Sequence, residues 1–385
     1  MAGKGGTLIL GGGFGGLTVA SALRNALGDA HEIRVIDRSD RFVMGSRKLW
    51  ALVGLGSLEE GSRSRSLLEE RGISFVKAQI ASIDPENRAV ATDAGDYSAE
   101  YLVVALGAVS RPELVPGLAE HGHNVWDPRA VPALVPILRD FRGGHVAIVI
   151  AGVPYTCPPA PYECAMLLHD HLEELGVRDR SQITVSTLQP ILLPNAGSEG
   201  SEWLARQLTE RGIRFQTAKP VRSVEPDAVH FEDDTSLPFD LLIGVPPHRP
   251  PAVVDDSGLA GEGPWISVNP STLETRFDAV YAVGDITKIS LANGMGLPKA
   301  GIMAELQGER VAAAIAARER GEPDPPPFDG RGYCFMEMGK SAATLIEGEF
   351  FASPVPKVSL GDVTARHAGD KHRFEAERLA RWFGW

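Results

Sequence analysis

Cysteine is the residue type best suited to redox chemistry in this 385-residue sequence, which contains Cys157, Cys164 and Cys334. Three cysteines are too few for a disulfide scaffold in a chain of this length, so they either do redox or nucleophilic work or lie buried and inert. Cys157 stands just before a predicted helix, whose dipole would favour its thiolate form. Cys164 follows two helical turns later and is expected to be a small core residue.

A glycine-rich turn follows the first apolar run and opens a helical pattern. The turn reads Gly11-Gly12-Gly13-Phe14-Gly15-Gly16, and an acid, Asp37, ends the next apolar run. Glycines at this spacing allow a tight turn, the approach of a pyrophosphate and close packing of helix on strand, while the acid can bind a ribose hydroxyl. The sequence therefore predicts a dinucleotide site, with these candidate contacts: Gly11, Gly13, Phe14, Gly15, Gly16, Asp37 and Arg38.

Short apolar runs rich in Val and Ile alternate with helical patterns along the chain. Such runs are typical of parallel strands buried on both faces. A strand, a glycine-containing turn and a helix occur near residue 8 and again near residue 146, so we expect an α/β fold of two Rossmann-like, doubly wound domains. The predicted strands are 7–10, 33–36, 101–105, 145–150, 183–186, 241–245 and 280–283, and the predicted helices are 16–27, 162–175, 199–211 and 299–318.

The composition excludes several classes of function. A net charge of −12 would repel phosphate-rich partners, so nucleic-acid binding is not expected. The first residues show no signal peptide, and no uncharged apolar run is long enough to cross a bilayer. We therefore expect a cytoplasmic protein whose membrane contact, if it has any, is peripheral to the inner face of the cell membrane. The histidines show no spacing typical of metal ligands, and no metal site is expected.

Two later segments resemble flavin motifs. Residues 101–108 resemble the strand-to-glycine segment with which two-dinucleotide-fold flavoproteins leave their FAD domain. Residues 280–285 resemble the second flavin motif of these proteins, in which a strand ends in Gly-Asp. The resemblance implies FAD as the cofactor, with further contacts at Ala105, Gly107, Gly284 and Asp285.

The second strand–turn–helix unit has lost its nucleotide fingerprint. Residues 152–163 read Gly-Val-Pro-Tyr-Thr-Cys-Pro-Pro-Ala-Pro-Tyr-Glu. The later glycines are absent, and four prolines remove amide donors and stiffen the backbone, so a pyrophosphate could not be cradled in the usual way. The next predicted strand supplies no ribose-binding acid. Use of a nicotinamide nucleotide is therefore disfavoured.

The same turn resembles the cysteine segment of sulfide:quinone oxidoreductases and of the flavoprotein subunit of flavocytochrome c sulfide dehydrogenase. Residues 333–340 resemble the segment that bears their second redox cysteine, and residues 246–251, 280–285 and 291–305 match in order, so the resemblance covers most of the chain. It implies FAD-dependent oxidation of sulfide, with quinone as the electron acceptor. Residues 42–50 contain no cysteine where the flavocytochrome attaches its flavin, so FAD is expected to be non-covalent.

The resemblance also implies roles for individual residues. Cys157 and Cys334 would form a redox pair beside the flavin. Sulfide would attack their disulfide and leave a persulfide on Cys157 and a thiolate on Cys334, which is expected to be nearer the flavin. Lys299 matches a family lysine near the flavin pyrimidine ring, where a cation stabilises negative charge. Glu163 is either an acid–base group beside the cysteines or a partner of the helix dipole.

Three other functions stay open. A type II NADH:quinone oxidoreductase would need the second glycine fingerprint, a soluble sulfide dehydrogenase would use a cytochrome acceptor, and a non-enzymatic flavoprotein sensor would use the cysteines as a switch. The basic, Trp-bearing segment 371–385 is amphipathic, which suits peripheral contact with a membrane or packing on the protein itself. The sequence also leaves open whether the chain forms a homo-oligomer.

Two Pro-rich segments, 246–251 and 322–328, suggest how the chain is divided. We expect residues 1–110 and 236–325 to form a discontinuous FAD-binding domain. Residues 111–235 would form the second Rossmann-like domain, with the altered nucleotide turn. Residues 326–385 would be a C-terminal segment that carries the second redox cysteine and the possible membrane or quinone contact.

Overall fold

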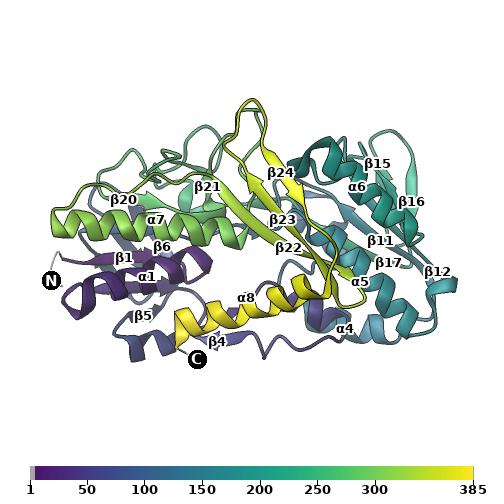
Figure 1. The fold of residues 1–385 in the computed structure, drawn as a ribbon, viewed down its shortest axis with the longest axis horizontal. Coiled ribbons are helices and arrows are strands. Elements are labelled where there is room, and N and C mark those ends of the chain that lie inside the picture. The colour runs from purple at the N-terminus through teal and green to yellow at the C-terminus, as the bar shows by residue number, and fades with distance from the viewer. Residues whose placement is uncertain (1–4, 385) are drawn as a thin grey trace.

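The computed structural model describes residues 5–384. Its first sheet is parallel and has the order β20-β9-β1-β2-β5. Helices α1 and α7 lie side by side on one face of this sheet (Figure 1). They approach closely because Gly308 has no side chain, and a Cβ there would lie 2.8 Å from the Gly15 carbonyl oxygen. The bounds are β1 Thr7–Leu10, β2 Ile33–Asp37, β5 Ser74–Lys77, β9 Tyr101–Val104, β20 Val280–Ala282, α1 Phe14–Leu27 and α7 Gly301–Arg320.

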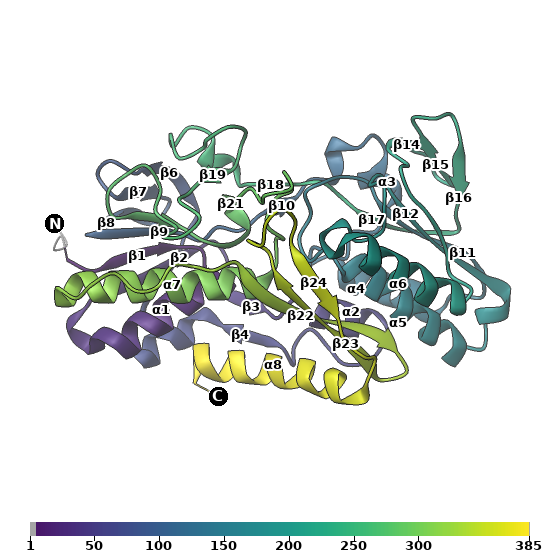
Figure 2. The same cartoon turned by 45° about the horizontal axis from the view of Figure 1, so that its top comes forward.

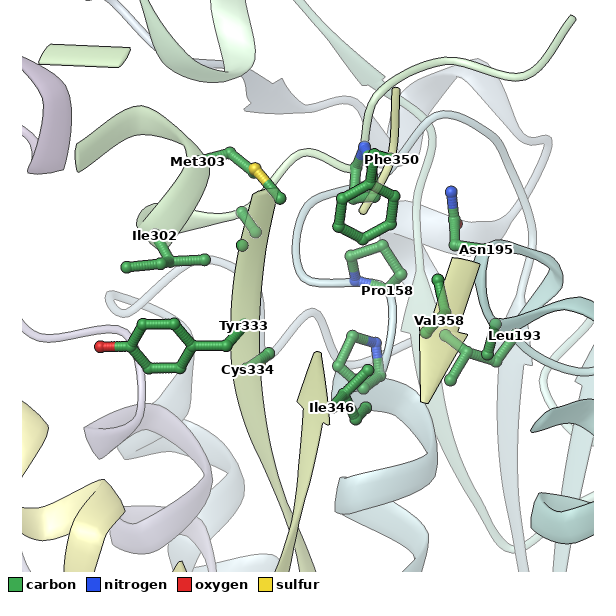
Figure 3. A pocket seen from close by; sticks show the side chains of 15 residues that line it. Pro158, Leu193, Asn195, Ile302, Met303, Tyr333, Cys334, Ile346, Phe350 and Val358 are labelled. Carbon is green, nitrogen blue, oxygen red and sulfur yellow. The ribbon is translucent and has the colours of Figure 1, made fainter. Parts of the chain in front are cut away.

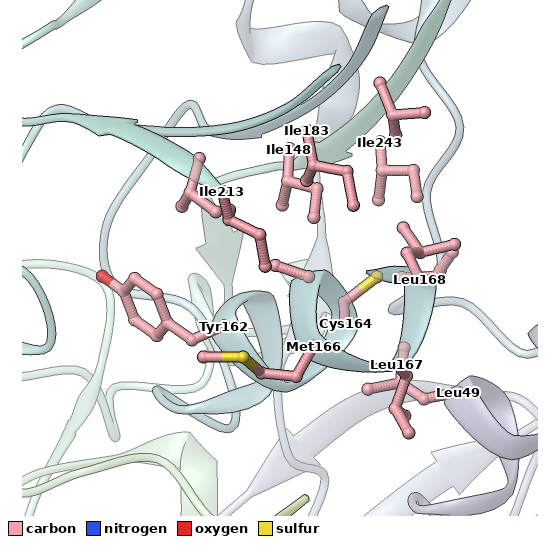
Figure 4. Packing of buried hydrophobic residues seen from close by; sticks show 14 of the residues in the cluster. Leu49, Ile148, Tyr162, Cys164, Met166, Leu167, Leu168, Ile183, Ile213 and Ile243 are labelled. Atoms are coloured by element: carbon pink, nitrogen blue, oxygen red, sulfur yellow. The ribbon is translucent and has the colours of Figure 1, made fainter. Parts of the chain in front are cut away.

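The second sheet is also parallel, with the order β13-β12-β11-β17. Figure 4 shows its core, where Ile148, Ile183 and Ile243 of the sheet pack on helix α5, which carries Cys164. Cys164 is 1% exposed, as expected for a core residue. The bounds are β11 Gly144–Ile150, β12 Ser181–Thr187, β13 Arg214–Gln216, β17 Leu241–Val245, α4 Val131–Arg139, α5 Ala160–Glu174 and α6 Gly197–Glu210. Together the two sheets confirm the predicted α/β fold with two Rossmann-like units.

One expected domain boundary needs correction. Strand β17 pairs in parallel with β11, so the second unit extends to about residue 245 and does not end at residue 235. The run 241–245 is buried and apolar, and such a run suits the interior of either parallel sheet. The sequence of residues 241–245 alone therefore does not show which of the two parallel sheets this strand joins. Strand β18 (His248–Arg249), just after it, pairs with β10 (Val109–Ser110), so the two chain crossings between the units lie side by side.

The C-terminal segment forms an antiparallel sheet of β22, β23 and β24 followed by helix α8. This sheet lies between the two parallel sheets (Figure 2), and β22 contacts both α5 and α7. The sheet therefore carries residues of the C-terminal segment to the junction of the two units. The bounds are β22 Arg331–Gly339, β23 Ala342–Glu349, β24 Lys357–Leu360 and α8 Ala365–Phe383.

Helix α8 packs on the protein itself. Leu379, Trp382 and Phe383 are at most 3% exposed. The Trp382 ring meets Phe14 edge-on, with ring centroids 4.9 Å apart, and its Nε1 donates to Thr18 Oγ1 at 3.2 Å. The apolar residues of α8 are thus covered by the protein and are not available to a membrane. Of the two alternatives for this segment, membrane contact and packing on the protein itself, the structure supports packing. Trp385 lies outside the described residues. Within residues 5–384, no helix combines the length and apolarity needed to cross a membrane.

The remaining elements are short. Two antiparallel three-stranded sheets are β6–β8 (Ile80–Asp84, Ala89–Thr92, Gly95–Ser98) and β14–β16 (Val221–Val224, Ala228–Phe231, Ser236–Pro238). Two-stranded pairs are β3 with β4 (Arg41–Val43, Ser62–Ser64) and β19 with β21 (Ile266–Ser267, Thr287–Lys288). The short helices are α2 (Arg47–Leu52) and α3 (Leu118–His121).

Candidate active site

A cavity of about 410 Å³ lies at the carboxyl ends of strands β1, β9 and β20. Ligands of open parallel sheets bind at this edge. Of the predicted flavin contacts, the cavity is lined by Gly13, Phe14, Gly15, Ala105, Gly107, Gly284 and Asp285. Residues from α2, from the turn before α5, from β22 and from α8 complete the wall, so all parts of the chain contribute to it. We refer to it as the FAD cavity, because its walls fit that cofactor, as follows.

The glycine turn leaves free space at the N-terminus of α1. Gly11 has φ +99°, and a Cβ there would lie 2.4 Å from the Ala105 carbonyl oxygen. A Cβ at Gly16 would lie 1.9 Å from the Gly11 carbonyl oxygen, so these two glycines are required by the turn itself. A Cβ at Gly13 would meet no heavy atom within 4 Å. Gly13 therefore faces the open space in which a pyrophosphate would approach the helix N-terminus.

The carboxylate of Asp37 accepts hydrogen bonds from the backbone of the glycine turn and of the residues after β2. Its Oδ2 accepts a hydrogen bond from Gly12 N at 2.8 Å, and its Oδ1 accepts one from Ser39 N at 2.9 Å. Arg65, which the sequence analysis missed, is buried beside it and donates from Nε to the Gly12 carbonyl oxygen at 2.8 Å. Arg65 lies in a 3₁₀-helix with no motif, so no sequence signal pointed to it. Arg38 is exposed and does not line the cavity.

Lys299 was expected near the flavin ring, but it does not line the FAD cavity. Lys299 Nζ donates to the carbonyl oxygens of Asp285, at 2.7 Å, and Thr287, at 3.1 Å, and lines a neighbouring cavity of about 380 Å³. Burial lowers the pKa of Lys299 to about 8, although Asp285 opposes this. Lys48 lines the FAD cavity, donates to the Trp126 carbonyl oxygen at 3.1 Å, and has its pKa lowered by burial.

The structure brings Cys157 and Cys334 together at the FAD cavity, although they are 177 positions apart in sequence. Both thiols are free, and they lie close enough for each to shift the pKa of the other. Cys157 has φ +57°, in the left-handed region. Its N–H donates to the Lys299 carbonyl oxygen at 2.7 Å, and its carbonyl accepts from Ala160 N at 2.9 Å. These two bonds fix the strained turn that places Cys157 next to Cys334 on β22.

The two cysteines differ in acidity. The neighbouring Cys334 thiol lowers the pKa of Cys157 against the effects of burial and of the Glu163 charge, and the charges of Lys371 and Lys48 add to the lowering. The pKa of Cys334 is raised well above its ordinary value by Cys157 and by burial. Cys157 is therefore the more acidic of the two thiols.

A buried charge cluster adjoins the cysteines. Glu163 is 4% exposed, and its Oε1 accepts a hydrogen bond from Lys371 Nζ. Its Oε2 accepts one from Glu337 N at 3.3 Å, and Lys371 Nζ lies 3.9 Å from Glu337 Oε1. Burial raises the pKa of Glu163, while Lys371 opposes the shift. Burial alone would lower the pKa of Lys371, but the two carboxylates outweigh it and raise this pKa to about 12. Glu163 thus faces the cysteines as an ionisable group; Lys371 and Glu337 were not predicted.

Cys334 also borders a smaller apolar cavity of about 50 Å³ (Figure 3). Figure 3 shows side chains of Met303, Leu193, Phe350 and Val358 around this space. Cys157 borders the FAD cavity but not this one. The two cysteines therefore face different surroundings, and of the two Cys334 alone borders both cavities.

The matching protein family is described as "Pyridine nucleotide-disulphide oxidoreductase", and its model matches residues 6–318. The chain is 28% identical over 370 residues to the sulfide-quinone reductase of Aquifex aeolicus, covering 90% of this chain and 83% of that protein. It is 25% identical over 368 residues to the mitochondrial sulfide:quinone oxidoreductase of Mus musculus, covering 90% of this chain and 79% of that protein.

Two further comparisons concern another quinone reductase and a solved structure. The type II NADH:quinone oxidoreductase of Staphylococcus aureus is 23% identical over 332 residues, covering 82% of this chain and 83% of that protein. Among solved structures, the sulfide:quinone oxidoreductase of Aquifex aeolicus superposes with a TM-score of 0.89 at 24% identity, covering 98% of this chain and 91% of that chain. This structural likeness confirms the fold and extends it over the C-terminal segment, which the family model does not reach.

Proposed function

Because this chain belongs to the pyridine nucleotide-disulphide oxidoreductase family, and is thus a flavin-dependent oxidoreductase, we propose that it oxidises sulfide and passes the electrons to a quinone. The observation that carries the proposal is the meeting of Cys157 and Cys334 at the wall of the FAD cavity. The relatives named sulfide:quinone oxidoreductase support the choice of substrates.

The cofactor is FAD, held without a covalent bond. The free space at Gly13 and the N-terminus of α1 would take its pyrophosphate, and Asp285 would face its ribityl–phosphate region. When bound, FAD supplies the two-electron chemistry that links a thiolate donor to a quinone acceptor. Lys299 acts as a positioning residue in this proposal, because its ammonium group holds the backbone of the segment that carries Asp285.

The first chemical step is thiol–disulfide exchange. In the oxidised enzyme Cys157 and Cys334 form a disulfide, and HS⁻ attacks the sulfur of Cys334. The disulfide bond breaks as the new S–S bond forms, which leaves a persulfide on Cys334 and a thiolate on Cys157. The more acidic thiol is the better leaving group, which supports Cys157 in that role. This order is the reverse of the one expected from the resemblance.

The surroundings of Cys334 support the same order. The cavity of about 50 Å³ beside Cys334 leaves room for an added sulfur atom, whereas Cys157 does not border it. Lys48 and Lys371 line the FAD cavity, where their positive charge would attract hydrosulfide and stabilise a thiolate. Trapping the enzyme after one equivalent of sulfide and mapping the persulfide by mass spectrometry tests the order; a persulfide on Cys157 alone would reverse it.

A quinone acceptor implies access to a membrane surface, and we place the protein at the cytoplasmic face of the membrane as a peripheral protein. Since the apolar face of α8 is buried, this contact has to use another surface. Binding to quinone-containing vesicles, measured for the whole protein and for variants of its exposed residues, would show which residues contact the membrane.

An anaerobic titration tests the proposal against NADH oxidation, the activity of the Staphylococcus aureus relatives. Sulfide should bleach the flavin and NADH should not, because Pro154, Pro158, Pro159 and Pro161 replace the amide donors of a nucleotide turn. Cys334→Ser should keep its FAD yet lose bleaching by sulfide, and Cys157→Ser should lose at least about 10²-fold in turnover. Bleaching by NADH and not by sulfide would overturn the proposal, as would normal bleaching in Cys334→Ser.

A further inference from the structure

A second cavity of about 410 Å³ lies beyond the buried charge cluster, on the side away from the FAD cavity. It is formed by α5, by the turn between β22 and β23, and by α8. Its wall includes Glu337 and exposed residues such as Leu55, Glu174 and Lys340. The cavity thus reaches from the buried Glu337 carboxylate to the protein surface. We call it the outer chamber.

Three buried polar atoms of the outer chamber lack a hydrogen-bond partner within the described part of the chain. They are Glu337 Oε2, Asp170 Oδ1 and His171 Nε2. Buried polar atoms are nearly always paired, and water fills a cavity that is polar and large enough. A single water needs roughly 10–15 Å³ of such space. The outer chamber is therefore polar enough and large enough for water, which would solvate these three groups.

The buried cluster connects this water with the FAD cavity. Glu337 is 6% exposed and lines the outer chamber, whereas Glu163 and Lys371 line the FAD cavity. Lys371 stands between the two carboxylates, hydrogen-bonded to Glu163 and 3.9 Å from Glu337 Oε1. Trp50 Nε1 donates to the same Glu337 oxygen at 2.7 Å, so Oε1 faces the cluster and Oε2 is left for the chamber.

We propose that the outer chamber is the proton inlet of the enzyme, and that Glu337 and Lys371 carry protons from its water to Glu163 at the FAD cavity. This inference rests on the proposed function. The overall reaction HS⁻ + quinone + H⁺ → S⁰ + quinol consumes one proton per turnover: the hydrosulfide supplies one hydrogen of the quinol and solvent supplies the other. At the outer chamber, the other titratable or charged groups that face this route are Asp170, His171, Glu174, Lys340 and His372. At the FAD cavity they are Lys48, Cys157 and Cys334.

The first test replaces Glu337 by Gln in the FAD-loaded enzyme. Gln keeps the size of the side chain and an oxygen for Trp50, but it cannot exchange a proton with the chamber. Bleaching of the flavin by sulfide should stay within about twofold of wild type. Reoxidation by a water-soluble quinone should slow by at least about tenfold, with a larger solvent deuterium isotope effect, and small weak acids such as formic acid should restore it. Glu173→Gln, on the exposed side of α5 and outside the chamber, is the matched control.

The second test partly fills the outer chamber without replacing an ionisable group. Gly369 lines the chamber within α8, and a Cβ there would meet no heavy atom within 4 Å. Leu is a better helix former than Gly, so Gly369→Leu should fold. Its side chain would displace water, and reoxidation should slow with the same rise in the isotope effect as in Glu337→Gln.

The outcomes separate the two proposals. Bleaching of the wild-type flavin by sulfide supports the proposed function whatever the variants do, and its absence would overturn both. Wild-type reoxidation rates in both variants would overturn the proton inlet alone. Slower reoxidation with an unchanged isotope effect and no rescue by weak acid would also overturn it, because a packing defect alone would give that result.

Discussion

Replacing Gly13 by Ala should separate cofactor binding from folding. Gly13 has φ −94° and ψ −163°, which alanine adopts without strain, and its Cβ would meet no heavy atom within 4 Å. Alanine at a compatible position also lowers the entropy of the unfolded chain, so the apoprotein should be as stable as wild type or more stable by about 0.4–1 kcal/mol. The new methyl group, however, would occupy the space that the pyrophosphate needs.

The size of the binding defect follows from overpacking. Forcing a methyl group into a filled site typically costs about 1–3 kcal/mol, which corresponds to a roughly 5- to 150-fold loss of FAD affinity. Gly16→Ala should behave differently, because its Cβ would lie 1.9 Å from a backbone oxygen and would damage the fold itself. The structure therefore predicts that Gly13→Ala loses FAD affinity and keeps its stability, whereas Gly16→Ala loses stability.

The assay uses apoprotein freed of FAD. Thermal unfolding reports the stability of the apoprotein, and titration followed by flavin fluorescence reports the affinity. Gly5→Ala is the control, because it makes the same chemical change at an exposed position with no heavy atom within 4 Å. Wild-type FAD affinity in Gly13→Ala, or an apoprotein destabilised as much as that of Gly16→Ala, would refute the reasoning.

Four further predictions follow from the site and its supports. Acid precipitation should release all the FAD, and flavin that stays with the polypeptide would show a covalent bond. Alkylation of Cys157 should have its pH midpoint below 9.0, because the pKa is lowered and the thiolate persists to lower pH. In Cys334→Ala the midpoint should rise, since the Cys334 thiol is the main cause of the lowered pKa and is lost; an unchanged midpoint would contradict that cause. Cys164→Ser should bleach normally with sulfide but unfold at lower urea concentration, since an unpaired hydroxyl in the core costs about 1–3 kcal/mol; lost bleaching would assign Cys164 a chemical role. Trp382→Ala should lower the free energy of unfolding in urea by about 3–5 kcal/mol. It should also weaken FAD binding, because the Trp382 ring packs on Phe14; unchanged FAD affinity would show that α8 does not support the cofactor site.

The parallel sheets could be predicted from the sequence because their strands are continuous apolar runs bounded by turns and helices. The glycine turn was equally visible, since its spacing follows from backbone geometry. The antiparallel sheet β22–β24 was not predicted: along β22 one exposed residue is followed by four half-buried and then four buried residues, so the strand lacks the alternation typical of an antiparallel sheet, and it is held by contacts with α5 and α7.

The charged groups of the site were harder to predict. Lys48, Lys371 and Glu337 come from three distant segments and acquire a role only when β22 and α8 bring them together. Nothing in the local sequence distinguishes Lys371 from a surface lysine on an amphipathic helix. Lys299 was identified by resemblance, but the direction of its side chain toward backbone carbonyls depends on the turn of residues 285–287, which no sequence pattern specifies.

The left-handed backbone of Cys157 limits which substitutions isolate the role of its thiol. A residue with a Cβ typically pays about 1–2 kcal/mol for this conformation, whereas glycine adopts it freely. Serine would keep the strain that cysteine carries, so Cys157→Ser removes the thiol and leaves the turn under the same constraint. Glycine would remove the thiol and relieve the strain together, and its effects could not be assigned to either one.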